Sequence, residues 1–275
     1  MRLPIINRFT CNVKQLESFI KEINSKNMKV IVDYANENQN DFNKNYRIMK
    51  ELILSKKSSH IAIKLSSLNI HNYSYAYESS LDLISQAVKN RNKIFVDAED
   101  FLIQESIDSI SDDLMSTFNK NEVNVYKTYQ MYRNDYLNIL RNDLMKDRGY
   151  YIGCKLVRGA YYNQDKKYNI LFNTIEDTHN SYNHGIESFN EFGKEKDKLL
   201  CATHNEESID KALSYKNKNI EYAQLLGMSD NLSQKLVNNG ETVYKYLPFG
   251  NFQETLPYLI RRLYENYPIL LNIFK

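Results

Sequence analysis

Glycine is scarce in this chain, and the two commonest phosphate-binding loops are missing with it. Only eight of the 275 residues are glycine. Neither a GxGxxG pattern after the first predicted strand nor a GxxxxGK pattern occurs anywhere. Both patterns bring backbone N–H groups close to phosphates. A dinucleotide, if one binds, must therefore be held in another way.

Other absences exclude whole classes of protein. The three cysteines, Cys11, Cys154 and Cys201, are odd in number and far apart, which is typical of reduced apolar residues in an intracellular protein and not of a disulfide framework or zinc site. No apolar run approaches the roughly 18 residues that span a bilayer. The net charge of +2, from 36 basic and 34 acidic residues, is spread without a basic stripe. We therefore expect no nucleic acid partner.

Eight short β-rich segments alternate with helical patterns along the chain. Their continuous apolar character is typical of parallel strands covered on both faces. The segments are KVIVDY (29–34), HIAIKLSS (60–67), KIFVDA (93–98), VNVYKTY (123–129), YYIGCKLV (150–157), KLLCATH (198–204), IEYAQLL (220–226) and TVYKYLP (242–248).

Helical spacing of apolar residues fills the intervals between these segments. It is clear at Leu81, Ile84 and Val88, at Ile107, Ile110 and Leu114, at Ile209, Ala212 and Leu213, and in an N-terminal helix with Val13, Leu16, Phe19, Ile20 and Ile23 on one face. The alternation predicts an α/β fold, a (β/α)8 TIM-like barrel with an N-terminal helix before the first strand. An open doubly wound sheet is the alternative. We expect one catalytic domain over residues 28–275, behind an extension and helix over residues 1–27.

Polar residues gather where the predicted strands end, and in a barrel these ends form the rim that carries the active site. They are Lys64, Asp97, Gln130, Lys155, Arg158, His204 and Tyr246. Lys64 lies within an apolar run, so it needs an anion or a shifted pKa. Arg158 beside Gly159 is either an anion holder or part of an ordinary surface turn.

The remaining polar positions have simple structural explanations as well. His204 is either functional or a capping or core residue, and we expect no metal because no other histidine shares a ligand spacing with it. Asp97 can cap a helix, although Asp100 fits that role better because a helical run begins at Phe101.

The stretch PYLIRRLYEN (257–266) carries two adjacent arginines in a helical pattern. Tyr258, Arg261, Arg262 and Glu265 follow the spacing i, i+3, i+4 and i+7, which places them on one helix face. Such a stripe is either a solvated face or, together with Tyr246 and Lys64 at the rim, a clamp for a small carboxylate.

Several motifs taken together resemble the proline dehydrogenase family, flavin-dependent barrel enzymes of proline catabolism. They are IKLSSL (63–68), FVDAED (95–100), YQMY (129–132), KLVRGAYY (155–162), ATHN (202–205), AQLLGM (223–228), VYKYLPFG (243–250) and PYLIRRLYEN. The resemblance implies FAD as cofactor and L-proline as substrate, oxidised to Δ1-pyrroline-5-carboxylate by hydride transfer from ring C5 to flavin N5. The residues of the motifs KLVRGAYY and AQLLGM are more similar to those of the eukaryotic branch of the family. This similarity implies a mitochondrial location, a quinone electron acceptor and possible peripheral association with the membrane.

The resemblance also implies roles for individual residues. Asp97, Lys155 and Lys64 match catalytic positions. Lys64, Leu225, Tyr246, Tyr258, Arg261 and Arg262 match positions that bind the substrate. Positions that contact FAD are matched by Ala98, Gln130, Lys155, Val157, Arg158, Gly159, Ala160, Tyr161, Thr203, His204, Asn205, Gln224 and Glu265.

Two departures from the bacterial pattern affect these assignments. Lys155 stands where bacterial members have an arginine near flavin N5, so the planar fork is lost although the charge is kept. AQLLGM is one residue shorter than its bacterial counterpart, which loosens the alignment of Gln224 and Leu225. Three alternatives stay open: a hydroxyproline dehydrogenase, which Tyr246 disfavours by leaving little room for a 4-hydroxyl; a barrel enzyme with Lys64 as a Schiff-base amine; and a barrel that only binds.

Overall fold

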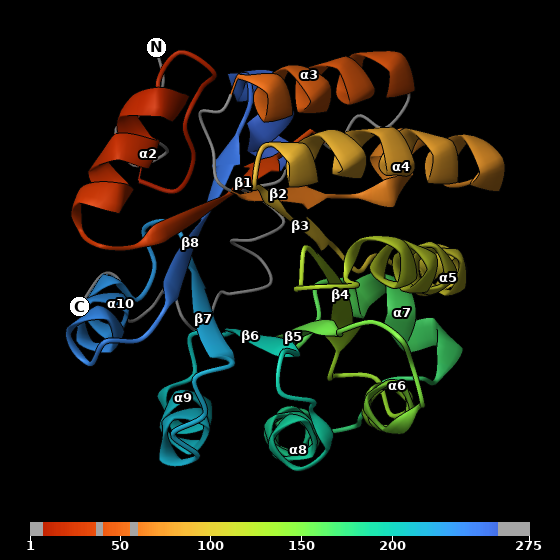
Figure 1. Ribbon diagram of the computed structural model, residues 1–275, viewed down its shortest axis with the longest axis vertical. Coiled ribbons are helices and arrows are strands. Elements are labelled where there is room, and N and C mark those ends of the chain that lie inside the picture. The colour runs from red at the N-terminus through yellow and green to blue at the C-terminus, as the bar shows by residue number, and fades with distance from the viewer. Residues whose placement is uncertain (1–7, 37–40, 56–59, 258–275) are drawn as a thin grey trace.

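The strands of this protein close into a parallel barrel, seen in a computed structural model that describes residues 8–36, 41–55 and 60–257 (Figure 1). Each strand pairs in parallel with the next, and β8 pairs with β1. The strands are β1 (Lys29–Tyr34), β2 (His60–Ile63), β3 (Lys93–Val96), β4 (Val125–Gln130), β5 (Gly153–Val157), β6 (Lys198–Ala202), β7 (Ile220–Leu225) and β8 (Val243–Phe249). The predicted TIM-like barrel is confirmed, and the open sheet is excluded.

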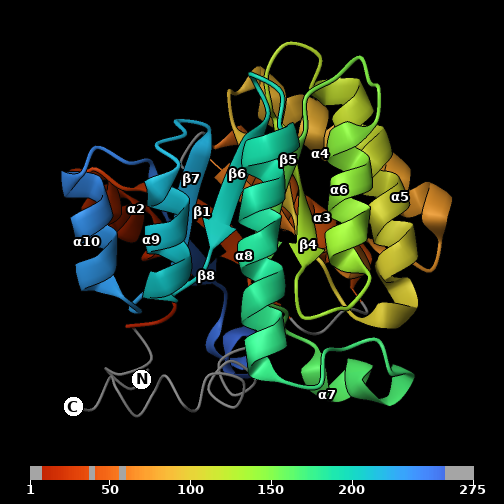
Figure 2. The same ribbon diagram turned by 90° about the horizontal axis from the view of Figure 1, so that it is seen from below.

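Helices cover the outside of the barrel on all sides, as Figure 1 shows. They are α2 (Leu16–Ser25), α3 (Phe42–Leu54), α4 (Tyr73–Lys89), α5 (Phe101–Phe118), α6 (Tyr136–Met145), α7 (Tyr162–Asp165), α8 (Ile175–Phe192), α9 (Glu206–Ser214) and α10 (Asp230–Asn238), with the short 3-10 helices η1 (Leu65–Leu68) and η2 (Lys166–Tyr168). The short helix α7 lies at the end of the barrel where α8 begins (Figure 2).

Two apolar layers explain why the strands read as continuous apolar runs. In β1, Val30 and Val32 belong to the large cluster packed against the helices, while Ile31 belongs to a second cluster with Phe95 and Tyr244. Successive side chains of a strand point to opposite faces. The second cluster therefore fills the inside of the barrel, and both faces of β1 are buried from Val30 onward.

The N-terminal helix is present but begins later than its pattern predicts. Leu16, Ile20 and Ile23 of α2 are buried, as expected, and α2 contacts β1. Val13 was expected on the same face, but it precedes the helix and is 58% exposed. The turn before α2 is closed by reciprocal hydrogen bonds between Asn12 and Gln15. Because of this turn, the helical spacing begins only at Leu16.

The helix that follows β3 begins as predicted. The Asp100 carboxylate accepts a hydrogen bond from the Leu102 N–H at 3.0 Å, which satisfies one of the free donors at the start of α5. Asp97 is thereby left free of capping and is available to the rim.

Candidate functional site

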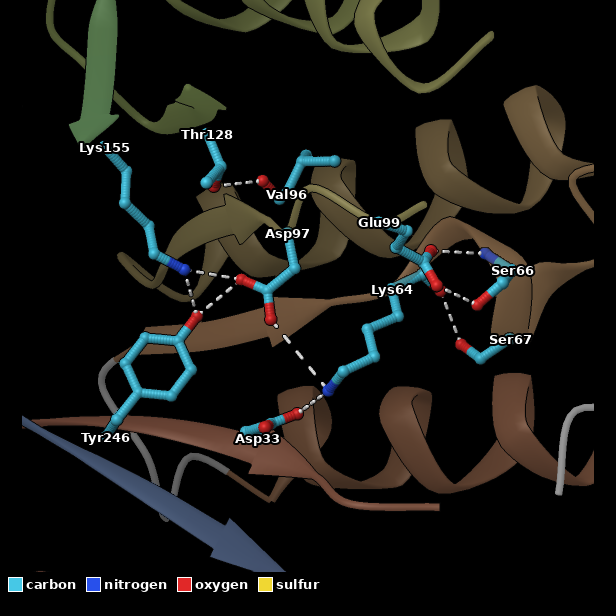
Figure 3. Close-up of polar contacts among 10 residues, drawn as sticks. All are labelled: Asp33, Lys64, Ser66, Ser67, Val96, Asp97, Glu99, Thr128, Lys155 and Tyr246. Carbon is cyan, nitrogen blue, oxygen red and sulfur yellow. Dashed lines mark hydrogen bonds and ion pairs between the residues drawn. The ribbon is translucent and has the colours of Figure 1, made fainter. Parts of the chain in front are cut away.

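The carboxyl ends of five strands bring charged and phenolic side chains together over the barrel (Figure 3). Asp33 comes from β1, Lys64 and Asp97 directly follow β2 and β3, Lys155 lies in β5, and Tyr246 lies in β8. We call these residues the rim network. Because all strands are parallel, their carboxyl ends lie at one end of the barrel. Four of the residues that the sequence places at strand ends, Lys64, Asp97, Lys155 and Tyr246, contact one another there.

Asp97, Lys155 and Tyr246 form a closed triangle of hydrogen bonds. Lys155 Nζ donates to Asp97 Oδ1 at 2.6 Å and to the Tyr246 hydroxyl at 2.8 Å. The Tyr246 hydroxyl donates to the same Asp97 oxygen at 2.7 Å. The ammonium group also lies 4.5 Å from the centre of the Tyr246 ring. Each member thus fixes the orientation of the other two.

Lys64 extends this triangle across the barrel to β1. Its Nζ lies 2.5 Å from Asp33 Oδ1 and 3.9 Å from Asp97 Oδ2. The side chains of Lys64 and Asp97 are each 14% exposed, whereas that of Asp33 is 3% exposed. Asp33 is therefore the anion that the Lys64 ammonium requires. Negative and positive charges alternate along Asp33, Lys64, Asp97 and Lys155.

The two lysines set the charge of Asp97. Burial alone would raise the pKa of the Asp97 carboxyl, but Lys155 and Lys64 outweigh it and hold this pKa below its ordinary value. For Lys155 burial has the larger effect, and its pKa is lowered in spite of Asp97. Asp97 is therefore a carboxylate at neutral pH and serves as an acceptor.

Glu99 supports the segment that presents Lys64. Its buried carboxylate accepts hydrogen bonds from the backbone N–H of Ser66 at 2.9 Å and from the Ser66 hydroxyl. Gln130 Nε2 donates to the Glu99 carbonyl at 2.9 Å. Burial raises the pKa of Glu99, against the hydrogen bonds from Ser66. Glu99 therefore joins the segments after β2 and β3 to the last residue of β4.

Asp33 and Glu99 were missed by reasoning from sequence. Asp33 gave the same signal as Lys64, a charged residue inside the apolar run KVIVDY. An ion in such a run requires a partner. This signal marks both residues as ions that need a partner, but it does not pair them with each other. Glu99 lies between Asp97 and Asp100 in VDAED (96–100). Asp97 was assigned to the rim and Asp100 to the helix cap, and no role was assigned to Glu99.

A second group of predicted residues lies at the ends of β5, β6 and β7. The Arg158 guanidinium donates to His179 Nδ1 at 2.8 Å and to Thr203 Oγ1 at 2.6 Å. It lies 4.5 Å from the centre of the Tyr182 ring, and burial lowers its pKa. Arg158 is thus part of a built network and not of a loose surface turn.

The loop after β6 is fixed mainly by its own polar residues. Asn205 caps α9 by accepting from the Ser208 N–H at 2.8 Å, so the cap is Asn205 and not His204. His204 Nδ1 lies 3.2 Å from the Ser229 hydroxyl. Gln224 Nε2 donates to the Thr203 carbonyl at 3.3 Å. The structure therefore brings four of the predicted site residues close together: Thr203, His204, Asn205 and Gln224.

The turn after β5 requires a glycine. Gly159 has φ of +146°, and a Cβ at this position would lie 2.4 Å from the Tyr132 ring. The neighbouring predicted residues Val157, Ala160 and Tyr161 are partly exposed, as are Ala98 and Leu225 at the ends of their strands. Tyr258, Arg261, Arg262 and Glu265 lie outside the described residues.

Two observations show that the site suits a polar, anionic ligand. Gln130 Oε1 is buried and has no hydrogen-bond partner among residues 8–36, 41–55 and 60–257, so a ligand N–H or O–H would satisfy it. In the same part of the chain Arg158 makes no ion pair with a carboxylate. FAD, with donors on its ring and ribityl chain and a negative pyrophosphate, fits both groups.

The described residues hold neither a cluster of metal ligands nor a helix suited to span a membrane. They contain no group of three or more His, Cys, Asp or Glu side chains that could hold a metal ion. None of their helices combines the length and the apolar character needed to cross a membrane.

Comparison with known families gives a match over most of the sequence. The profile of the family described as proline dehydrogenase matches residues 16–269. The chain is 36% identical over 209 residues to proline dehydrogenase 1, mitochondrial, of Dictyostelium discoideum, covering 68% of this chain and 36% of that protein. It is 32% identical over 213 residues to hydroxyproline dehydrogenase of Xenopus laevis, covering 70% of this chain and 46% of that protein.

Solved structures show the same barrel at lower sequence identity. Proline utilization A from Corynebacterium freiburgense superposes with a TM-score of 0.85 at 19% identity, covering 96% of this chain and 31% of that chain. The same protein from Bdellovibrio bacteriovorus, inactivated by N-propargylglycine, gives 0.82 at 16% identity, covering 94% and 32%. This chain spans about a third of the length of most of these proteins.

Proposed function

Because the chain belongs to the proline dehydrogenase family, we propose that it oxidises L-proline to Δ1-pyrroline-5-carboxylate with FAD as cofactor. The observation that carries the proposal is the rim network, in which Lys64, Asp97, Lys155 and Tyr246 meet at the end of the barrel that holds active sites. We propose residues 28–275 as the single catalytic domain, behind an extension and helix over residues 1–27.

The proposed cofactor site follows the ends of β3 to β7. The residues that would hold FAD are Ala98, Gln130, Lys155, Val157, Arg158, Gly159, Ala160, Tyr161, Thr203, His204, Asn205, Gln224 and Glu265. FAD, when bound, supplies the acceptor for the hydride that leaves ring C5 of proline. Within this site the buried Gln130 Oε1, which has no hydrogen-bond partner among the described residues, would accept a hydrogen bond from the ligand.

The substrate carboxylate would be held by cations at the rim. Lys64, Arg261 and Arg262 are the proposed partners, with Leu225, Tyr246 and Tyr258 as the walls around the ring. Lys64 reaches this place already oriented, because its ammonium contacts Asp33 at 2.5 Å. Fixing the carboxylate at a charged group and the ring between side chains limits the rotation of the substrate. The side chains thus select the ring carbon that reacts.

Proton and charge control would come from Asp97 and Lys155. Proline must lose its amine proton before the ring can give up a hydride, and nearby cations favour the neutral amine. Lys155 has three N–H donors, and two of them are engaged by Asp97 and Tyr246. Among the described residues no acceptor takes the third N–H, which would be available to the cofactor, and Lys155 would stabilise negative charge on the reduced flavin through its own charge.

Proline is the proposed substrate in preference to hydroxyproline. The Tyr246 ring is 7% exposed, and its hydroxyl is held by Asp97 and Lys155. A side chain fixed in this way does not swing aside for a 4-hydroxyl group. A kcat/KM for hydroxyproline equal to that for proline would refute this preference.

The wider setting is proposed from the relatives. Those from Dictyostelium discoideum and Caenorhabditis elegans are named as mitochondrial, and we propose the same location for this protein. A quinone is the proposed electron acceptor, with peripheral association with the membrane as the way to reach it. Reduction of a soluble quinone analogue by proline-reduced protein tests the acceptor.

An absorption spectrum of the purified protein tests the central proposal. We expect a visible flavin band that bleaches when L-proline is added without oxygen, and that returns when a quinone analogue is added. D-Proline serves as a control, because its carboxylate and C5 cannot both occupy the positions of the L-enantiomer. A protein that purifies without flavin, or a band that L-proline leaves unchanged, would overturn the proposal.

A further inference from the structure

The Arg158 guanidinium is surrounded by neutral partners. It donates from Nε to His179 Nδ1 at 2.8 Å, from Nη1 to Thr203 Oγ1 at 2.6 Å and from Nη2 to the Ser208 hydroxyl at 3.1 Å. These partners come from α8, from the end of β6 and from α9. Each of the three nitrogens thus donates to a protein acceptor, which fixes the orientation of the guanidinium and uses three of its five N–H groups.

The contacts of Thr203 fix the direction of its hydroxyl hydrogen. Its oxygen accepts from Arg158 Nη1 at 2.6 Å and from the Asn205 N–H at 3.1 Å. A hydroxyl has two acceptor lone pairs and one donor hydrogen. With both lone pairs engaged, Thr203 can only donate further, and no protein acceptor for that hydrogen is found in the described part of the chain. The side chain is 7% exposed.

His179 in turn fixes Arg158. The Nδ1 atom can accept the Arg158 Nε–H only when it carries no proton, so His179 is a neutral imidazole in this arrangement. Burial and then Arg158 lower the pKa of His179, against Glu176 and Glu207. Tyr182 covers the other side of the guanidinium at 4.5 Å. Arg158 therefore donates in both directions, to His179 Nδ1 on one side and to Thr203 Oγ1 on the other.

We propose that Arg158 is a positioning residue that, held by His179, obliges the Thr203 hydroxyl to donate its hydrogen to an acceptor-only group of the cofactor, its pyrophosphate. This inference rests on the proposed function, because FAD is the ligand. It changes the expected role of Arg158 from a direct contact to an action through Thr203.

A double-mutant cycle on FAD affinity tests the proposal. Holoenzyme of the wild type, R158M, T203V and R158M/T203V is diluted in steps, and released FAD is followed by its fluorescence. We expect each single variant to hold FAD at least about tenfold more weakly, the size of a lost charge-assisted hydrogen bond. The double variant should be no more than about threefold weaker than T203V, because Arg158 acts through the hydroxyl that T203V removes.

Other outcomes identify which part is wrong. Effects that multiply in the double variant would mean that the guanidinium contacts FAD itself, and an R158M protein with wild-type affinity would remove Arg158 from the site; both overturn the inference. If the wild type purifies without FAD, the proposed function fails as well. Circular dichroism spectra, recorded at the temperature of the FAD measurements, check that the variants are folded.

A matched pair at position 179 keeps the test independent of R158M. In H179N the amide oxygen takes the place of Nδ1 as acceptor, whereas H179F keeps a ring without an acceptor. We expect FAD affinity within about threefold of wild type for H179N and at least about fivefold weaker for H179F, as for one lost hydrogen bond. Equal affinities of H179N and H179F would overturn the role of His179 in the chain of hydrogen bonds.

Discussion

The two ends of the barrel interior bury a carboxylate in contrasting ways. At the amino end, Glu221 of β7 accepts hydrogen bonds from the Tyr126 hydroxyl at 3.0 Å and the Tyr244 hydroxyl at 3.2 Å. At the carboxyl end, Asp97 is bonded to one tyrosine and to the charged Lys155, with Lys64 near by. Neutral donors hold the first carboxylate, and cations dominate around the second.

Packing follows the same division. The Phe95 and Tyr126 rings stack with centres 4.4 Å apart, and Lys29 and Lys93 lie over tyrosine rings at the amino end. This end is therefore a closed aromatic layer whose polar atoms satisfy one another. The rim network is a set of charges that retains capacity for a ligand. We infer that substitutions at the amino end cost stability, and that those at the rim cost the proposed activity.

The largest expected effect is at the amino end. Tyr126→Ala removes a fully buried ring and should lower the free energy of unfolding by about 3–5 kcal/mol through the cavity it leaves. Urea denaturation measures the change. Proline turnover by the folded fraction should stay within about twofold of wild type. A Tyr126→Ala protein that is stable but inactive would reverse the comparison.

At the rim, Lys64→Met should reduce kcat/KM for proline by about 10- to 100-fold, since a charge-assisted hydrogen bond contributes about 1.5–3 kcal/mol. Steady-state kinetics with FAD-loaded protein measure it. The change also leaves Asp33 buried without its lysine. Lys64→Met combined with Asp33→Asn should therefore recover stability but not activity, and a recovery of both would remove Lys64 from substrate binding.

His60 makes the stability of the amino end depend on pH. Burial, together with Lys93 and Lys29, lowers its pKa from 6.5 to about 3. Between these values the unfolded chain takes up a proton that the folded chain refuses, so stability is lost as the pH falls below 6.5, by at most about 1.4 kcal/mol per unit.

The variant His60→Asn isolates this contribution. Its amide oxygen can still accept from the Lys93 N–H, as His60 Nδ1 does at 3.2 Å, but it does not titrate. Unfolding free energies of the two proteins should diverge as the pH is lowered from 6.5 to 5. Parallel curves over that range would contradict the assigned pKa.

The smallest effect compares tyrosines at the two ends. Tyr246→Phe should lower the free energy of unfolding by about 0.5–1.5 kcal/mol, because Asp97 keeps Lys155. Tyr126→Phe should cost more, since one of the two tyrosine donors to Glu221 is lost. Paired denaturation curves of both variants measure the difference. Equal losses of unfolding free energy in the two variants would show that a carboxylate held by tyrosines and one held by cations respond alike to the loss of a tyrosine hydroxyl.

The sequence predicted the fold well because parallel strands covered on both faces have a strong apolar pattern. All eight predicted segments contain the observed strands or overlap them, and KVIVDY matches β1 residue for residue. It also placed Lys64, Asp97, Lys155 and Tyr246 at one rim. These successes rest on strand direction, which the alternation of elements already determines.

Contacts between distant residues could not be predicted in the same way. Nothing in the sequence pairs Lys64 with Asp33, or directs Arg158 at His179 and Thr203, because these contacts depend on side-chain direction at the ends of separate strands. Val13 was misplaced because a turn interrupts the helical spacing. Asp33 and Glu99 were missed as buried carboxylates, although an ion in an apolar run is a detectable signal.

The pairing of β8 with β1 has a consequence for protein synthesis. Six residue pairs join these strands, with Ile31 beside Tyr246, so β8 must find a strand that left the ribosome about 200 residues earlier. Until residue 246 has emerged, Asp97 lacks its tyrosine and the barrel has an open edge at β1. The nascent chain therefore passes through a period in which an unpaired strand edge and incomplete charge pairs are both accessible, and chaperones would be needed most at that stage.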